Sequence, residues 1–174
     1  MMRLGVSLLL SLLLIPAQAA DSPQLRFKPL QGQLAFKQTK QLQGLPVALK
    51  SSGYIQLAAE QLLWHTTTPV DSKLQVSPAG VSQWQQQQYV AVSGSEFVGQ
   101  LMLAILQQQH QFISSHFALS DDDGCQLLQP LQAPLNTLFV QIRLCGDSTL
   151  QQIVLHETNG NSTTIELLHE AGLD

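Results

Sequence analysis

Two histidine–glutamate pairs, His156-Glu157 and His169-Glu170, could in principle supply a general base or metal ligands. The zinc-hydrolase motif H-E-x-x-H needs two histidines one helical turn apart, and neither pair provides that spacing. The chain also lacks the G-x-S-x-G turn of serine hydrolases, and its five histidines are scattered without metal-ligand spacing. The sequence therefore predicts a protein that is not an enzyme, with no cofactor, no catalytic residue and no metal site.

An acidic run, Asp121 to Asp123 followed by Gly124, superficially suggests a calcium loop. An EF-hand needs oxygen ligands at alternate positions and a glutamate at the twelfth, but the twelfth position here is Gln132. The run is therefore interpreted as a solvated hairpin turn.

The N-terminus has the three parts of a secretory signal. Arg3 supplies the positive charge, residues 8–15 are apolar, and Ala17-Gln18-Ala19 is a small-x-small cleavage site. The apolar run is shorter than the ~20 residues that span a bilayer, and no cysteine follows it for lipid attachment. We therefore expect residues 1–19 to be a cleaved signal peptide, and residues 20–174 to be a single domain located in the periplasm.

Cys125 and Cys145 are the only cysteines, and an oxidising compartment favours a disulfide between them. Bonding requires Cα atoms closer than about 7 Å, which the spacing in sequence does not supply. A possible disulfide is expected at these two positions, and an unbonded pair remains the alternative. No C-x-x-C motif points to a metal or a redox role.

The charge composition limits the classes of molecule that this protein is expected to bind. The net charge is −4, with 8 Lys and Arg against 12 Asp and Glu. Neutralising phosphates requires clustered positive charge, so nucleic acid is excluded as an expected partner.

Short alternating segments separated by turn residues predict consecutive hairpins. The Phe36, Ile55 and Trp64 segments each place apolar side chains on one face. The predicted strands are residues 33–42, 46–50, 53–59, 61–67, 72–77, 81–92, 116–120, 125–129, 136–145, 150–157 and 162–168. Alternation places His65 on the face opposite Trp64, where an exposed or rim position is expected.

One helix interrupts the strands. Ser93 and Glu96 have the spacing of a capping box, and residues 97–106 are almost uninterruptedly apolar. A helix that is apolar all round must be covered on most sides. It is therefore either a buried core helix or a lid whose inner side faces a ligand cavity.

Several segments together resemble the LolA-type family of periplasmic outer-membrane lipoprotein carriers, in its divergent branch. The segments are F-x-Q-x-K-x-L at 36–42, K-S-S-G at 50–53, L-L-W-x-T-x-x-P at 62–69, the apolar helix, F-x-x-I-x-L at 139–144 and E-x-N-G-N-S-T-x-I at 157–165. Their order and spacing carry the resemblance, which covers nearly all of residues 20–174.

The resemblance implies an α+β fold: a strongly curved antiparallel sheet, an unclosed half-barrel, with helices covering its concave face. It also implies a monomeric carrier that binds acyl chains of lipoproteins or lipids in an apolar cavity and shuttles them from the inner to the outer membrane. The implied partners are an acylated lipoprotein or lipid cargo, an inner-membrane exporter and an outer-membrane acceptor. The predicted lipid-binding cavity comprises Phe36, Ile55, Leu57, Leu62, Trp64, Leu74, Val76, Phe97, Leu101, Ile105, Val140, Ile142, Leu144, Ile153 and Leu155.

Two departures from the better-known carriers affect the lid. Those proteins hold it with an arginine just before the tryptophan strand, whereas this chain has Leu57-Ala58-Ala59-Glu60 there. They begin with a longer amphipathic helix, which Pro23, Pro29 and Gly32 disfavour here. A non-transporting periplasmic binding or scaffold module, accessory to a fatty-acid-derived or aryl-polyene lipid pathway, is the alternative, and a hydrolase or other enzyme is the third hypothesis.

Overall fold

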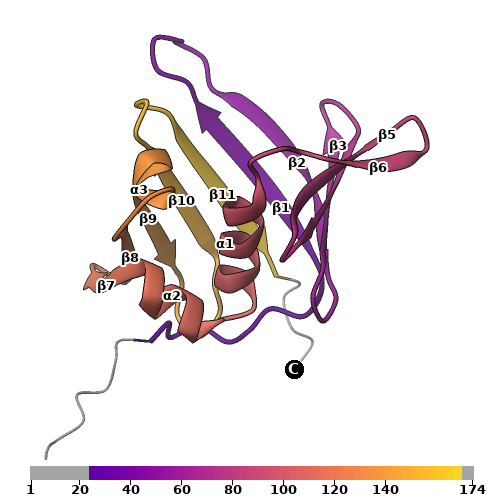
Figure 1. Ribbon diagram of the computed structural model, residues 1–174. Coiled ribbons are helices and arrows are strands. Elements are labelled where there is room, and N and C mark those ends of the chain that lie inside the picture. Colours follow the sequence, from indigo (N-terminus) through magenta and orange to yellow (C-terminus); the bar gives the residue numbers. More distant parts are fainter. Residues whose placement is uncertain (1–23, 170–174) are drawn as a thin grey trace, which may run out of the picture.

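Eleven antiparallel strands form one curved sheet in the computed structural model, which describes residues 24–169 (Figure 1). The predicted signal peptide lies outside the described residues. The strands are β1 (Gly32–Gln41), β2 (Leu49–Leu57), β3 (Leu62–Thr68), β4 (Ser72–Ser77), β5 (Gly80–Gln85), β6 (Gln88–Ala91), β7 (Phe117–Asp122), β8 (Cys125–Pro130), β9 (Phe139–Cys145), β10 (Gln152–Glu157) and β11 (Ser162–Leu168). The helices are α1 (Glu96–Leu106), α2 (His110–His116) and α3 (Leu135–Leu138).

The order of strands across the sheet is β6-β5-β4-β3-β2-β1-β11-β10-β9-β8-β7. The first and last strands therefore pair at the centre, and the edge strands β6 and β7 do not pair with each other. Figure 1 shows α1 against the concave side of the curved sheet. These features confirm the predicted α+β half-barrel with helices on its concave face.

The concave side is called the inner face below. The end with the β1–β2, β3–β4, β5–β6 and β10–β11 turns is the hairpin end, at the top of Figure 1. The opposite end is crossed by residues 24–31, which are called the strap (Figure 1). Strand alternation builds the inner face, as at Phe36, which is 1% exposed while its neighbour Lys37 is exposed.

The strap is extended rather than helical, as Pro29 and Gly32 led us to expect. Leu25, Phe27 and Leu30 on the strap are buried and belong to the hydrophobic core. The strap thus closes one end of the half-barrel.

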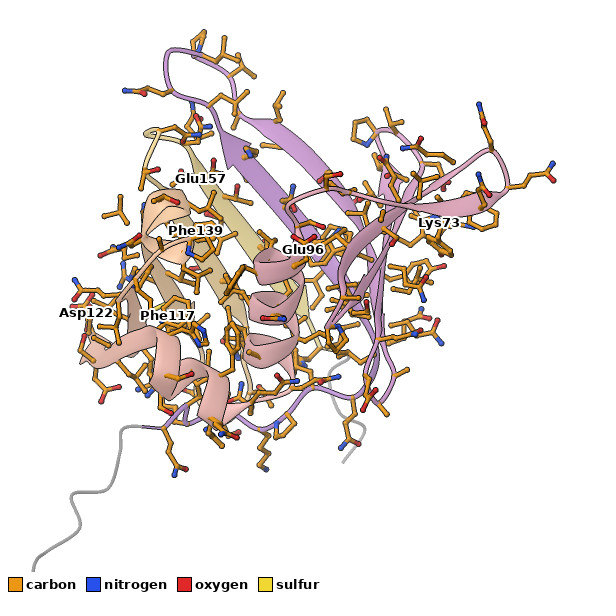
Figure 2. The ribbon with its side chains drawn as sticks, in the orientation of Figure 1. Lys73, Glu96, Phe117, Asp122, Phe139 and Glu157 are labelled. Atoms are coloured by element: carbon orange, nitrogen blue, oxygen red, sulfur yellow. A yellow bond between two sulfur atoms is a disulfide. The ribbon has the colours of Figure 1, made fainter. Side chains whose placement is uncertain are left out.

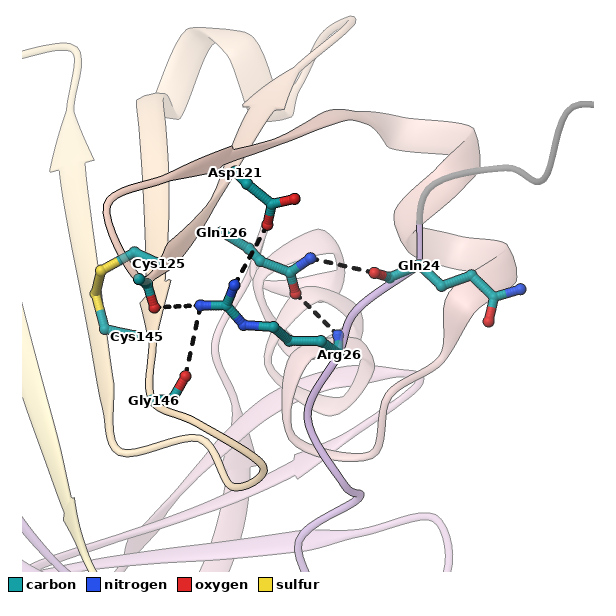
Figure 3. Close-up of polar contacts among 8 residues, drawn as sticks. Gln24, Arg26, Asp121, Cys125, Gln126, Cys145 and Gly146 are labelled. Atoms are coloured by element: carbon teal, nitrogen blue, oxygen red, sulfur yellow. Dashed lines mark hydrogen bonds and ion pairs between the residues drawn. A yellow bond between two sulfur atoms is a disulfide. The ribbon is translucent and has the colours of Figure 1, made fainter.

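Polar contacts fix the strap to the sheet (Figure 3). The side-chain amide of Gln126 accepts a hydrogen bond from the Arg26 N–H at 2.9 Å and donates one to the Gln24 carbonyl at 3.2 Å. The Arg26 guanidinium reaches Asp121 Oδ1 at 3.4 Å and the carbonyl of Gly124. The buried Gln126 therefore bonds the strap backbone much as a neighbouring strand would, and the N–H groups of Lys28 and Leu30 donate to the Ser148 and Leu106 carbonyls, both at 2.9 Å.

Cys125 and Cys145 lie directly opposite each other on β8 and β9, with their Cα atoms 4.2 Å apart. The structure joins them by a disulfide, which cross-links two neighbouring strands next to the strap (Figure 3).

Several predicted boundaries were wrong. The 46–50 and 53–59 segments are one strand, β2, and residues 135–138 form helix α3 before β9 begins. The predicted 81–92 strand is a hairpin, because Gln86 and Gln87 adopt φ values of 46° and 68° and reverse the chain. Two consecutive residues with positive φ are typical of a tight hairpin turn, but Gln-Gln does not signal one.

The predicted capping box is also wrong. The N-cap of α1 is Ser95, and its hydroxyl does not cap the helix. Instead Ser95 Oγ accepts a hydrogen bond from the Val81 N–H at 2.9 Å and donates to the Val92 carbonyl. Ser95 therefore ties the start of α1 to β5.

Candidate functional site

The inner face is the candidate site, because most residues of the predicted cavity lie there in or against the core. Ten are buried: Phe36, Ile55, Leu62, Trp64, Val76, Leu101, Ile105, Ile142, Leu144 and Ile153. Leu57, Leu74 and Leu155 are partly buried and pack against the same core. Phe36 is on β1 and Trp64 is on β3, with β2 between them. The centroids of their rings lie 4.4 Å apart.

Val140 is a correction to the predicted set, since 59% of it is exposed. Gln141 pairs with His156, whereas Phe139 pairs with the next residue, Glu157, so Val140 is the extra residue of a β-bulge. The bulge turns Phe139 instead of Val140 towards the core. Strand alternation alone could not indicate where the register shifts.

Phe97 is only partly covered. It lies in the first turn of α1 and is 37% exposed. Its ring meets the edge of the His116 ring at 6.4 Å between centroids. Phe97 therefore lies at the margin of the inner face rather than in its centre.

Helix α1 packs very closely on the sheet through a glycine. A Cβ at Gly99 would lie 2.9 Å from Gly80 Cα and 2.9 Å from the Ser77 carbonyl oxygen, so only glycine fits. Gly80 in turn adopts φ +123°, a conformation that other residues rarely adopt. The helix and the β4–β5 turn are thereby in backbone contact.

Neutral hydrogen bonds connect α1 to its surroundings at both ends. Near the first turns, Gln100 Nε2 donates to the Pro78 carbonyl at 3.2 Å. At the C-terminal end, Gln107 Nε2 donates to the Ala58 and Ala59 carbonyls at 3.1 and 3.2 Å. Of these two amides, that of Gln107 contacts the 57–60 segment, where the sequence has no arginine. The sequence offered no signal for this pairing, because it depends on the relative position of helix and turn.

The inner face is filled by its own side chains and those of α1, several of which are no more than 1% exposed. A hollow of about 490 Å³ lies at the strap end, between the strap, the β2–β3 turn and the end of α1. Leu30, Leu57 and Gln107 are among the residues lining it. The hollow therefore marks the seam along which α1 and the strap meet the sheet.

The hairpin end of the inner face is polar. Lys40 Nζ lies 3.2 Å from Glu157 Oε1, although β1 and β10 are separated by β11. Figure 2 shows Glu157 towards the hairpin end. Burial raises the pKa of Glu157, but hydrogen bonds from Lys40, Asn159 and Asn161 and the attraction of Lys40 outweigh it, so its pKa lies below the ordinary value.

Sequence reasoning missed this ion pair. Counting by twos from Phe36 along β1 places Lys40 on the inner face. Its partner, Glu157, could not be predicted, because that contact depends on the order of strands in the sheet. His156 and Glu157 are neighbours on one strand, so their side chains leave on opposite faces. The first histidine–glutamate pair therefore cannot act on one ligand together.

His65 is on the outer face, as alternation predicted, and its side chain is 12% exposed, so of the two expected positions, exposed or rim, the exposed one was wrong. Its Nδ1 and Nε2 atoms lie 2.7 Å from Tyr54 Oη and 2.7 Å from Asp71 Oδ2. These contacts tie β2, β3 and the β3–β4 turn together.

Within residues 24–169, no group of three or more His, Cys, Asp or Glu side chains is placed to hold a metal ion. In the same residues, no helix is both long and apolar enough to cross a bilayer.

Comparison with known proteins gave matches by structure only. No protein-family model matches the sequence, and no curated protein does so. A LolA superfamily protein from Nitrosomonas europaea is similar with a TM-score of 0.48 and 7% identity, over 84% of this chain and 90% of that chain. LprF from Mycobacterium bovis is similar with a TM-score of 0.37 and 13% identity, over 83% of this chain and 88% of that chain.

A putative outer membrane lipoprotein-sorting protein domain from Vibrio parahaemolyticus has a TM-score of 0.33 and 10% identity, over 82% of this chain and 87% of that chain. The Nitrosomonas protein belongs to the superfamily whose motifs this sequence resembles. At such identities and scores, the likeness describes only the course of the chain.

Proposed function

We propose that this protein is a periplasmic carrier that binds acyl chains of lipids or lipoproteins between α1 and the inner face of the sheet. The observation that carries the proposal is the apolar interface between them: Leu101 and Ile105 of α1 are no more than 1% exposed, and they cover an inner face of the same character. The helix is connected to nearby turns by neutral hydrogen bonds rather than by charges. In this proposal α1 is a lid that leaves the inner face when ligand enters.

The energies of opening and binding are of similar size. Uncovering the four large aliphatic side chains that α1 buries, Leu101, Leu103, Ile105 and Leu106, costs about 8 kcal/mol, at about 2 kcal/mol each. Burying a twelve-carbon chain contributes about 9 kcal/mol, at about 0.8 kcal/mol per methylene. One chain therefore roughly offsets the opening of the lid, and two or three chains favour the open, loaded form. Acylated lipoproteins and phospholipids carry that number of chains.

The remaining parts of the proposal follow from the predicted signal and the family resemblance. We expect residues 1–19 to direct export, and residues 20–174 to act as a monomer that receives cargo from an inner-membrane exporter and delivers it to an outer-membrane acceptor. Binding without chemical change is expected, because the proposal assigns no catalytic residue.

The test is binding of a fluorescent acyl probe to the purified mature protein, together with native mass spectrometry of protein from the periplasm. A carrier should bind the probe and retain acylated cargo. Leu101→Asp and Trp64→Asp should weaken binding, because an unpaired charge is costly in an apolar site. Lys37→Asp on the outer face is the matched control. Wild-type protein that is folded but binds no probe would exclude the proposal.

A non-transporting binding or scaffold module is favoured by one observation, which is that the inner face is filled by the protein's own side chains. A scaffold would keep α1 in place and present its surface to another protein. Native mass spectrometry separates the two functions, because a scaffold should retain a protein and a carrier should retain acylated cargo.

A further inference from the structure

The inner face changes from apolar to polar along six neighbouring strands. At its centre lie apolar residues such as Phe36, Ile55 and Trp64. Two residues or more closer to the hairpin end, the same faces carry polar side chains: Lys40 on β1, Ser51 on β2, Thr66 on β3, Ser72 on β4, Glu157 on β10 and Thr163 on β11. A ligand lying along this face would meet apolar surface at one end and polar groups at the other.

We propose that the hairpin end of the inner face binds the polar head of the ligand, with Lys40 and Glu157 pairing a zwitterionic ammonium–phosphate head group. This inference rests on the proposed function, because it assumes that the acyl chains occupy the apolar part. It adds the class of ligand: zwitterionic phospholipids in preference to anionic or uncharged acylated molecules.

Lys40 and Glu157 lie where such a head would be. Lys40 pairs with Thr163 in the register of β1 and β11, and Thr163 Oγ1 lies 3.5 Å from Glu157 Oε1, so all three share the inner face. Leu155 is the partner of Thr163 on the other side and packs against the core. Lys40 and Glu157 therefore lie directly beside the apolar part of the inner face.

The pair can open without leaving Glu157 unsatisfied. Asn159 Nδ2 and Asn161 Nδ2 lie 3.2 and 3.4 Å from Glu157 Oε2 and donate to it. Lys40 has three donors, and Glu157 is its ion-pair partner within the described residues. The Lys40 side chain is 37% exposed, so its ammonium can turn towards the phosphate of the ligand. The Glu157 carboxylate can then accept a hydrogen bond from the ligand's ammonium.

The charges of Lys40 and Glu157 then determine which head group of a ligand binds. A zwitterion supplies a partner to each charge, so the site remains neutral and fully paired. An anionic head would gain Lys40 but repel Glu157, and an uncharged head would replace neither partner. The two opposite charges 3.2 Å apart therefore favour a head that carries both signs.

The test uses three ligands with two octanoyl chains and a glycerol backbone, because a single chain only offsets the opening of the lid. They are dioctanoyl phosphatidylethanolamine, which is zwitterionic, dioctanoyl phosphatidic acid, which is anionic, and dioctanoylglycerol, which is uncharged. Binding to the mature protein is measured by calorimetry below the critical micelle concentrations. Wild-type protein should bind the zwitterionic ligand about tenfold more tightly than either of the others, as one charge-assisted hydrogen bond can supply. Glycerophosphoethanolamine, which has the same zwitterionic phosphodiester head but no acyl chain, should not compete at millimolar concentration.

Variants assign the effect to the pair. Lys40→Gln should weaken binding of the zwitterionic ligand and should weaken binding of the anionic ligand further, because only the repulsion from Glu157 then remains for it, and Lys40→Arg should retain the wild-type affinities because the positive charge remains. Glu157→Gln should shift the preference to dioctanoyl phosphatidic acid, since the repulsion is removed. Lys37→Gln, an exposed lysine on the outer face of the same strand, should change nothing. Thermal unfolding confirms that each variant is folded.

The outcomes separate this inference from the proposed function. Binding of all three dioctanoyl ligands with equal affinity would overturn the head-group site while leaving acyl-chain binding in place. Tight competition by glycerophosphoethanolamine would also overturn it, because the site would then recognise a soluble zwitterion rather than a lipid. No binding of any acylated ligand, or of the fluorescent probe, would instead exclude the proposed function.

Discussion

Replacing Gln107 by alanine should make the protein bind acyl chains more tightly while making it less stable. Gln107 Nε2 donates to the carbonyls of Ala58 and Ala59 at 3.1 and 3.2 Å, and these bonds exist only while α1 lies on the inner face. Net contributions of hydrogen bonds near water are small, so the two together are worth about 1 kcal/mol. Their loss should raise the open fraction of the lid about fivefold.

Apparent affinity follows the open fraction, because only the open form accepts ligand in the proposed mechanism. The dissociation constant of a fluorescent acyl probe should therefore fall about fivefold in Gln107→Ala, and the melting temperature of the free protein should fall. Gln111→Ala on α2 is the matched control, since the exposed Gln111 side chain makes no hydrogen bond within the described residues. Unchanged or weaker binding by a destabilised Gln107→Ala protein would refute α1 as the lid.

Three further results are expected from other parts of the structure. Cys125→Ala should lower the free energy of unfolding by about 3 kcal/mol, because the disulfide closes a loop with a sequence separation of 20 residues; an unchanged denaturation midpoint would contradict this. Gln87→Gly should stabilise the β5–β6 turn by up to about 1 kcal/mol, since φ of 68° is strained for glutamine, and the melting temperature measures it. The low folded-state pKa of Glu157 stabilises the protein above the ordinary glutamate pKa, so stability should fall as acidification passes through the folded-state value. Glu157→Gln should lose less stability on acidification, because it lacks this carboxyl group. Identical plots of unfolding free energy against pH for the two proteins would refute the contribution of Glu157.

Strand faces could be predicted from the sequence because side chains alternate with a period of two. The period placed Phe36, Ile55 and Trp64 on one face without knowledge of their partners, and they lie there in the core. The same period failed at Val140, where an extra residue in β9 shifts the register. A bulge depends on how two strands pair, and that pairing is a property of the sheet.

Turns were predictable only where their residues have special backbone preferences. Asn159-Gly160 indicates the β10–β11 turn, since Gly160 has φ of +83°. Gln86-Gln87 makes the same kind of reversal without such residues, so the hairpin could not be distinguished from one long strand. The cross-strand rings of Trp84 and Tyr89, 4.9 Å apart between centroids, hold the β5–β6 hairpin together instead of turn chemistry.

Pairs formed across the sheet were beyond prediction from the sequence. Lys40 meets Glu157 because β11 brings β1 and β10 together, and Gln107 meets Ala58 because α1 ends above the β2–β3 turn. The two contacts differ in character. The lid is held by amides, whose bonds do not change with protonation, whereas the head-group site depends on a carboxylate. In the proposed carrier, acid would therefore weaken recognition of the head group before it affects closure of the lid. Selection of the cargo and opening of the cavity are then separate properties, set at opposite ends of the same inner face.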